Sequence, residues 1–280
     1  MIIDIHTHTF PDRIAVKAIQ KLQSCSHTVP VSDGTADGLL ETMKKSGVDL
    51  SVVLPVATAP KQVTSINNSA AEVNEKGMGL FSIGAMHPDY EDWYSELGRI
   101  KALGLKGIKL HPVYQGVDLD DLRYLRIMNR CAELGLFVIA HMGLDIGYPG
   151  VYKCTPEMAY SAVREIGAFD FVLAHMGGWR SWDTVLELLP ETGVKLDTAF
   201  STGHFPAADD GYWTEEDTQL MQREEFMKFV EAFGTDRILF GTDSPWHDSR
   251  EDLEFIRSLP LSKEQIDQIL GENAARLLGL

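Results

Sequence analysis

The chain has 280 residues, of which 44% are hydrophobic and 24% are charged, so it can bury the core of one α/β barrel. Its formal net charge of −16 would repel phosphate backbones and anionic membranes, which makes nucleic acid and membrane surfaces poor partners. No apolar run reaches the roughly 18 residues of a membrane span, and no basic residue precedes an apolar stretch near Met1, so neither insertion nor secretion is expected.

Eight short apolar runs recur along the chain, starting near residues 2, 50, 80, 105, 136, 171, 194 and 237. Most have four to eight residues and few polar ones, as expected for parallel strands that are buried on both faces.

Helical patterns stand between these runs. Residues 39–47, 120–135 and 155–167 each end in glycine, and the third begins with the N-cap Thr155 followed by proline. The longest helix is predicted over residues 215–234, and a last one closes the chain from residue 267.

The alternation of strands and helices predicts βαβ units, and eight of them predict an α/β fold of the (β/α)8 TIM-barrel type, formed by a single domain over residues 1–280. A doubly wound sheet is disfavoured because no G-x-G-x-x-G turn follows the first strand. Segments 10–35, 112–119, 144–155 and 200–217 are expected to be loops that shape a pocket, with 201–217 as a candidate lid.

The three cysteines are widely spaced and form no C-x-x-C pair, which argues against a disulfide framework or a thiolate zinc site. Cys131 lies in an apolar helical pattern and is predicted to be a core residue. This usage of cysteine fits a reducing compartment, so we expect a cytoplasmic protein.

Polar side chains that can bind metal or move protons stand at the carboxyl ends of five of the predicted strands. They are His6, His8, Lys109, His111, His141, His175 and Asp243. In a barrel these ends form the face on which active sites are built. Because side chains alternate along a strand, His6 and His8 share one face, and Lys109 and His111 share another.

Three histidines and one aspartate on rigid strand ends predict a metal site, which suits Zn²⁺ well and Mn²⁺ or Fe²⁺ less clearly. A single H-x-H is weak support, because a lone histidine is more often structural. The combination with His and Asp on other strand ends is much stronger. Asp4 shares the parity of His6 but lies a step deeper, so we expect it below the ion.

Two further residues are candidates for contact with substrate. Arg180 follows H-M-G-G and could bind a carboxylate with both of its nitrogens, although an exposed surface arginine is an equally good explanation. Trp246 lies beside the Asp243 turn, where a structural role is slightly favoured.

The sequence resembles the amidohydrolase superfamily, in particular the amidohydrolase-2 branch that includes aminocarboxymuconate-semialdehyde decarboxylase, aromatic-acid decarboxylases and lactone hydrolases. The resemblance rests on DIHTH near the start, KGIKLHP at 106–112, AHMG at 140–143, AHMGGW at 174–179, FGTDSPW at 240–246 and GENAARLLG at the end. These motifs run through the whole chain in order.

The resemblance implies that His6, His8, His141 and Asp243 bind one divalent ion, most often zinc. It implies that Asp243 also takes a proton from water and that His175 is an acid/base. A second ion bridged by a modified Lys109 is the less favoured alternative. In the one-ion case Lys109 and His111 support the ligands or bind substrate, as Arg180 and Trp246 would.

Three functions follow as expectations. The first is a hydrolase that cleaves an ester, lactone or amide of a small carboxylate-bearing or cyclic molecule with metal-activated water. The second is a non-oxidative decarboxylase of a small aromatic or unsaturated acid at the same site. The third, a non-catalytic metal-binding barrel, is disfavoured because structural zinc sites are usually closed and rich in cysteine. The expected partner is a small-molecule substrate, and a homodimer is possible.

Overall fold

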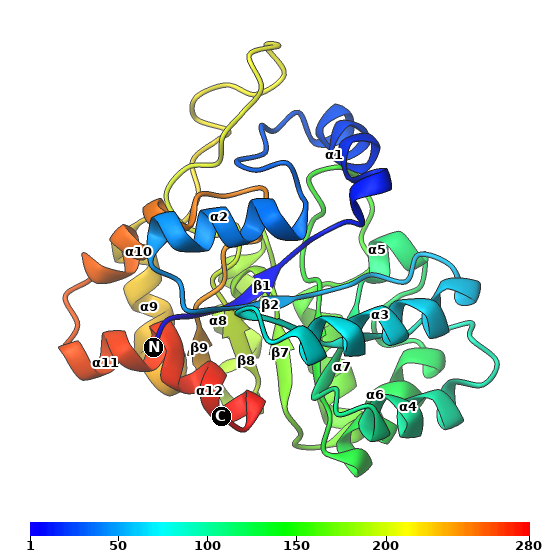
Figure 1. Ribbon diagram of the computed structural model, residues 1–280. Coiled ribbons are helices and arrows are strands. Elements are labelled where there is room, and N and C mark those ends of the chain that lie inside the picture. Colours follow the sequence, from blue (N-terminus) through cyan, green and yellow to red (C-terminus); the bar gives the residue numbers. More distant parts are fainter. The chain divides into compact units, whose positions relative to one another are not determined.

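The computed structural model describes residues 1–280, in which parallel strands alternate with helices along the whole chain (Figure 1). The chain divides into two compact units. Unit 1 comprises Met1–Val53, Ile146–Pro149 and Asp197–Leu280, and unit 2 comprises Leu54–Asp145 and Gly150–Leu196.

Unit 1 contains strands β1 (Ile3–Thr7), β2 (Leu50–Val53) and β9 (Ile238–Leu239). Its helices are α1 (Asp12–Ser26), α2 (Ala36–Ser46), α9 (Arg223–Phe233), α10 (Ser249–Arg257), α11 (Lys263–Asp267) and α12 (Asn273–Leu278), with a π-helical turn at Gln268–Glu272 and a 3₁₀ turn at Thr235–Arg237. Strands β1 and β2 pair in parallel with Ile3 opposite Leu50. Helices α2 and α10 pack against each other in this unit (Figure 1).

Unit 2 contains β3 (Leu80–Ser82), β4 (Gly84–Ala85), β5 (Gly107–Leu110), β6 (Phe137–Ala140), β7 (Phe171–Leu173) and most of β8 (Lys195–Asp197). Its helices are α3 (Val63–Lys76), α4 (Trp93–Ala102), α5 (Pro112–Gln115), α6 (Leu122–Leu134), α7 (Pro156–Ile166) and α8 (Trp182–Leu188), with 3₁₀ turns at Pro60–Gln62, His175–Gly177 and Pro190–Thr192. Strands β4 to β8 pair in parallel in chain order, and β5 and β6 are completely buried.

All eight predicted runs form strands at the expected places, and the third is interrupted at Ile83 into β3 and β4. The expected helix caps are also present. The Thr155 hydroxyl accepts the amide of Met158, and Gly135 ends α6 in the left-handed conformation that favours glycine.

The predicted helix over 215–234 is wrong in its first half, because α9 begins only at Arg223. The Asp217 carboxylate accepts the amide and the hydroxyl of Thr214, which closes a turn that competes with helix formation. The amides of Leu220 and Met221 then bond to carbonyls of the preceding loop, so residues 201–222 form one long irregular segment.

Two segments that were expected to be loops contain helices instead. Residues 12–26 form α1, whose buried Ala15 and Ile19 are spaced as on one helix face. Residues 112–115 form the short helix α5, which starts at a proline directly after His111. Segments 144–155 and 200–217 have no helix or regular strand, as predicted. No helix is both long enough and apolar enough to cross a bilayer.

Candidate metal centre and neighbouring polar cluster

Strand β1 and the loop after β9 bring His6, His8 and Asp243 together within unit 1. The Ile5 amide donates to the Phe240 carbonyl, and the Asp243 amide donates to the carbonyl of His6. The His8 amide bonds to the next part of the same loop, at the Ser244 carbonyl. The backbone therefore fixes the three side chains on two adjacent rigid segments.

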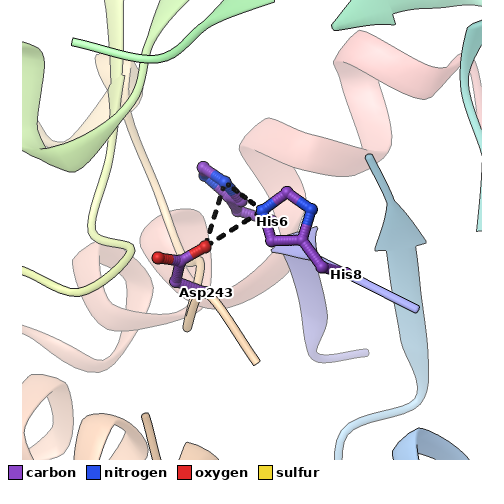
Figure 2. A group of neighbouring side chains, drawn as sticks. All are labelled: His6, His8 and Asp243. Carbon is purple, nitrogen blue, oxygen red and sulfur yellow. Dashed lines mark hydrogen bonds and ion pairs between the residues drawn. The ribbon is translucent and has the colours of Figure 1, made fainter. Parts of the chain in front are cut away.

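The three side chains point their polar atoms at one another (Figure 2). His6 Nε2 lies 3.2 Å from His8 Nε2, and Asp243 Oδ1 lies 3.4 Å from the first and 3.1 Å from the second. Ligand atoms about 2.0–2.2 Å from one Zn²⁺ ion stand roughly 3.3–3.6 Å apart in a tetrahedron, and closer in an octahedron. The triangle thus has the dimensions of a metal coordination shell, and the residues fit a divalent ion.

Asp197, at the end of β8, prepares His6 for that role. Its Oδ2 lies 2.8 Å from His6 Nδ1, and both side chains are buried. A carboxylate at this distance holds the proton on Nδ1, so that the lone pair of Nε2 faces His8 and Asp243, where a metal would bind. Asp197 is not among the site residues predicted from the sequence. A carboxylate at the carboxyl end of a predicted strand, in VKLDTAF, was the available signal.

Asp4 is bonded to backbone and hydroxyl groups of the two segments that carry the triangle. Its carboxyl accepts the amide of His6 together with the amide and the hydroxyl of Thr242. Burial raises the pKa of Asp4 to about 8, against the lowering effect of these hydrogen bonds. Asp4 therefore ties β1 to the loop that carries Asp243.

The remaining predicted polar residues, Lys109, His111, His141 and His175, lie in unit 2 and are buried. Lys109 pairs with Ile139 across β5 and β6, so His111 and His141 follow at the same end of neighbouring strands. Their rings stack with centroids 4.2 Å apart. His175 Nε2 lies 3.0 Å from His141 Nδ1. Unit 2 thus brings three of the predicted histidines into one cluster.

Asp145 belongs to this cluster and is not among the site residues predicted from the sequence. Its Oδ2 lies 3.6 Å from His111 Nε2 and 3.7 Å from His141 Nε2. The position four residues after His141 was the only local signal. Gln115 contacts this cluster through its side-chain oxygen, which accepts the His111 amide, and its side-chain nitrogen donates to two backbone carbonyls.

Several of these residues have strained backbone conformations. Asp243, His175 and Arg180 have φ values of 64°, 58° and 64°, in the left-handed region that non-glycine residues rarely adopt. Such strain of order 1–3 kcal/mol per residue gathers at functional sites. The Trp182 indole donates to the carbonyl of His175 and so helps to hold that conformation.

Arg180 and Trp246 are less clearly functional. Arg180 is exposed and its guanidinium lies over the ring of Trp179, 4.9 Å from the centroid. Trp246 is half-buried, and its backbone amide donates to the Asp243 carbonyl to close the turn. Their predicted contact with substrate stays a prediction, as does the assignment of His141 to the same ion as His6 and His8.

This chain is similar to known proteins in its sequence profile and in its fold. The sequence profile described as amidohydrolase matches residues 3–280. No curated protein matches the sequence. The 5-carboxyvanillate decarboxylase from Sphingomonas paucimobilis superposes with a TM-score of 0.70 at 16% identity, covering 100% of this chain and 99% of its own.

Two further solved structures show the same architecture. A TIM-barrel protein from Bordetella bronchiseptica gives a TM-score of 0.73 at 18% identity, over 99% of this chain and 98% of the other. A structure described as a putative 2-pyrone-4,6-dicarboxylic acid hydrolase from Pseudomonas putida gives 0.63 at 17% identity, over 99% and 97%. These full-length matches confirm the predicted TIM-barrel fold. Because the family profile also spans nearly the whole sequence, this chain belongs to the amidohydrolase family.

Proposed function

We propose that the protein is a metal-dependent hydrolase of small carboxylate-bearing or cyclic esters, lactones or amides, with Zn²⁺ as its preferred ion. The observation that carries this proposal is the triangle of His6, His8 and Asp243, together with the Asp197 contact that orients His6 Nε2 into the triangle. Two nitrogens and one carboxylate oxygen are a donor set that suits Zn²⁺.

When bound, a divalent ion polarises a carbonyl group and makes water acidic enough to react near neutral pH. The chain's residues do the rest. Asp243 is about 15% exposed, and only its Oδ1 takes part in the triangle, so its other oxygen is the proposed acceptor of a proton from water. Asp197 and Asp4 keep the ligands oriented.

His175 is the proposed donor of a proton to the leaving group. Its Nε2 shares a hydrogen bond of 3.0 Å with His141 Nδ1, so a proton on one ring can be stabilised by the other. The cationic candidates Lys109, His111 and Arg180 are the proposed partners of a substrate carboxylate.

Decarboxylation is the second candidate function. It is favoured by the number of solved structures of similar fold that are described as decarboxylases, among them a 2,6-dihydroxybenzoate decarboxylase complexed with its substrate and a dihydroxybenzoic acid decarboxylase with bound manganese. The substrates named in these descriptions and in that of the pyrone hydrolase are small ring compounds with carboxylate groups. This supports a small cyclic acid as the substrate class for either reaction.

Product analysis separates the two reactions. The zinc-loaded protein is incubated with panels of lactones, amides and aromatic acids, and CO₂ release is recorded separately from acid formation. Hydrolysis without CO₂ supports the main proposal, and CO₂ without hydrolysis supports the alternative. A His6→Ala/His8→Ala double variant should lose both metal and turnover. If it keeps its full metal content and activity, the triangle is not the catalytic centre.

A further inference from the structure

A buried histidine of unit 1 attaches the irregular segment 201–222 to helix α10 and to the loop before it. His247 Nδ1 lies 2.8 Å from Asp252 Oδ2, and its Nε2 lies 2.9 Å from the carbonyl oxygen of His204. The other oxygen of Asp252 accepts the hydroxyl of Thr202 at 2.8 Å. The side chains of His247 and Asp252 are only 2% and 1% exposed. These two residues therefore hold the start of the segment at two positions, Thr202 and His204.

The number of protons on His247 decides whether both of its contacts can form. An ionised carboxylate and a carbonyl oxygen accept hydrogen bonds but donate none, so each ring nitrogen needs a proton of its own. A neutral imidazole has one N–H group, whereas the imidazolium ion has two. The pair of contacts is therefore that of protonated His247.

The surroundings of His247 favour this protonated form. Burial lowers its pKa, but the charge of Asp252 and the hydrogen bonds to Asp252 and to the His204 carbonyl outweigh that effect and raise the pKa to about 9. The other titratable or charged groups around the ring are Arg223 of α9, the imidazole of His204 in the segment, and Asp248, Glu251 and Glu254 at the start of α10 and within it. The ring borders a cavity of about 210 Å³, which is large enough for water, so the proton can exchange with solvent.

Loss of the proton breaks one of the two contacts. The remaining proton stays on Nδ1, because a hydrogen bond to the ionised carboxylate of Asp252 is stronger than one to a neutral carbonyl. Nε2 of His247 then presents a lone pair to the carbonyl oxygen of His204, and two acceptors 2.9 Å apart repel each other. The bond between Thr202 and Asp252 does not depend on this proton. Deprotonation therefore releases the chain from His204 onward.

The part that would be released is a short paired stem. The Phe205 amide donates to the Thr218 carbonyl and the Leu220 amide donates to the Gly203 carbonyl, so residues 203–205 and 218–220 are joined and should move as one. The far end of the segment has its own attachment, because Asp210 Oδ2 lies 2.7 Å from His27 Nδ1. In Figure 1 the segment is the yellow loop that extends beyond α2 and α10 of the same unit.

We propose that protonated His247 is a latch that holds the stem of segment 201–222, the candidate lid, against α10, and that loss of this proton frees the stem. The latch requires neither a metal ion nor a substrate. It can therefore be tested without knowledge of the reaction, and its failure would leave the proposed function untouched.

Two measurements on the full-length wild-type chain, from about pH 6 to about pH 10, test the latch. Nitrogen-15 NMR of the histidine side chains reports the protonation of His247. Hydrogen exchange read by mass spectrometry, corrected for the intrinsic effect of pH on exchange, reports the opening of residues 203–205 and 218–220. We expect His247 to carry two protons at neutral pH and to lose one near pH 9. The protection of the stem should fall roughly 10-fold with the same midpoint, as expected for the loss of one hydrogen bond from a charged donor.

Three variants identify the group that causes the transition. His247→Phe keeps a ring but has no proton to lose, so its stem should have low protection throughout and show no transition. Asp252→Asn removes the charge that stabilises the imidazolium, so its midpoint should move down toward the ordinary histidine value of about 6.5. His204→Asn is the matched control, because it removes the neighbouring imidazole but keeps the backbone carbonyl, and its midpoint should equal that of the wild type.

Two outcomes would overturn the latch. The first is a wild-type stem whose protection stays constant while His247 loses its proton, and this result needs no variant to fold. The second is a transition that persists unchanged in His247→Phe, because another group would then cause it.

Discussion

Replacing Asp197 with Asn should weaken metal binding at the triangle without unfolding the protein. Asp197 uses both carboxylate oxygens: Oδ2 faces His6 Nδ1 at 2.8 Å and Oδ1 accepts the Ala199 amide at 3.2 Å. The Asn side chain has one oxygen and one NH2 group, so its NH2 group must face one of these two donors. If it faces His6, the imidazole proton moves to Nε2 and blocks the nitrogen that binds the ion.

The expected size of the effect follows from the role of Asp197. Carboxylates that orient a metal-binding histidine typically change metal affinity 10–100-fold when they are replaced, which corresponds to roughly 1.4–2.8 kcal/mol. The contact is fully buried, so solvent screening does not reduce this value. The dissociation constant for Zn²⁺ should therefore rise by one to two orders of magnitude.

Competition with a chromophoric chelator at fixed pH measures the change. Asp12→Asn, at an exposed position in the first turn of α1, is the control and should leave the affinity unchanged. Thermal unfolding of the metal-free forms shows whether the fold is retained. An affinity of Asp197→Asn equal to that of the wild type would refute the argument that Asp197 sets the tautomer of His6.

Three other changes test the scaffold. Gly107→Ala should lower the free energy of unfolding by about 1–3 kcal/mol in urea titrations, because the new Cβ would lie 2.5 Å from the backbone oxygen of Phe137. An unchanged free energy of unfolding would show that β5 and β6 can move apart to accept the methyl group. Gln115→Leu leaves two buried carbonyls without their side-chain donor, so it should lower the free energy of unfolding by about 2–4 kcal/mol in the same assay. An unchanged free energy of unfolding would show that these carbonyls find other donors. Burial lowers the pKa of His247, but the charge and hydrogen bond of Asp252 outweigh it and raise that pKa to about 9. The pKa of this histidine in the unfolded chain is near 6.5, so protonated His247 beside Asp252 contributes about 3 kcal/mol to the free energy of unfolding below pH 6.5, and this contribution is lost as the pH rises through 9. His247→Asn should remove this part of the pH dependence of stability. An unchanged pH dependence in that variant contradicts the assignment.

The sequence predicted the features that depend on local periodicity. The H-x-H spacing in a strand places His6 and His8 on one face. Asp243 lies near them because the carboxyl ends of parallel strands meet on one side of this fold. The strands were found for the same reason, since each is a short run of apolar residues bounded by turn signals.

Residues whose roles depend on distant backbone geometry could not be predicted in this way. Asp197 contacts a histidine 191 positions away, and nothing in its immediate neighbourhood distinguishes it from an ordinary strand-end aspartate. Asp145 reaches its cluster through a turn whose shape is set by Gly143 and Trp179. The helix predicted from residue 215 begins only at Arg223 for a similar reason, because the hydrogen bonds between Thr214 and the Asp217 side chain replace helical ones.

The link between Asp4 and Thr242 joins positions that are 238 residues apart, and the triangle's ligands lie within four positions of them in the sequence. An ion in the triangle is therefore also a cross-link that closes almost the entire chain into a loop. Because the ion binds the folded chain and not the unfolded one, it stabilises the fold by about 2.7 kcal/mol when its free concentration is about 100 times its dissociation constant. The ion that supports chemistry would thus also stabilise the folded chain, and chelation would remove that contribution while the hydrogen bonds between β1 and the Asp243 loop remain.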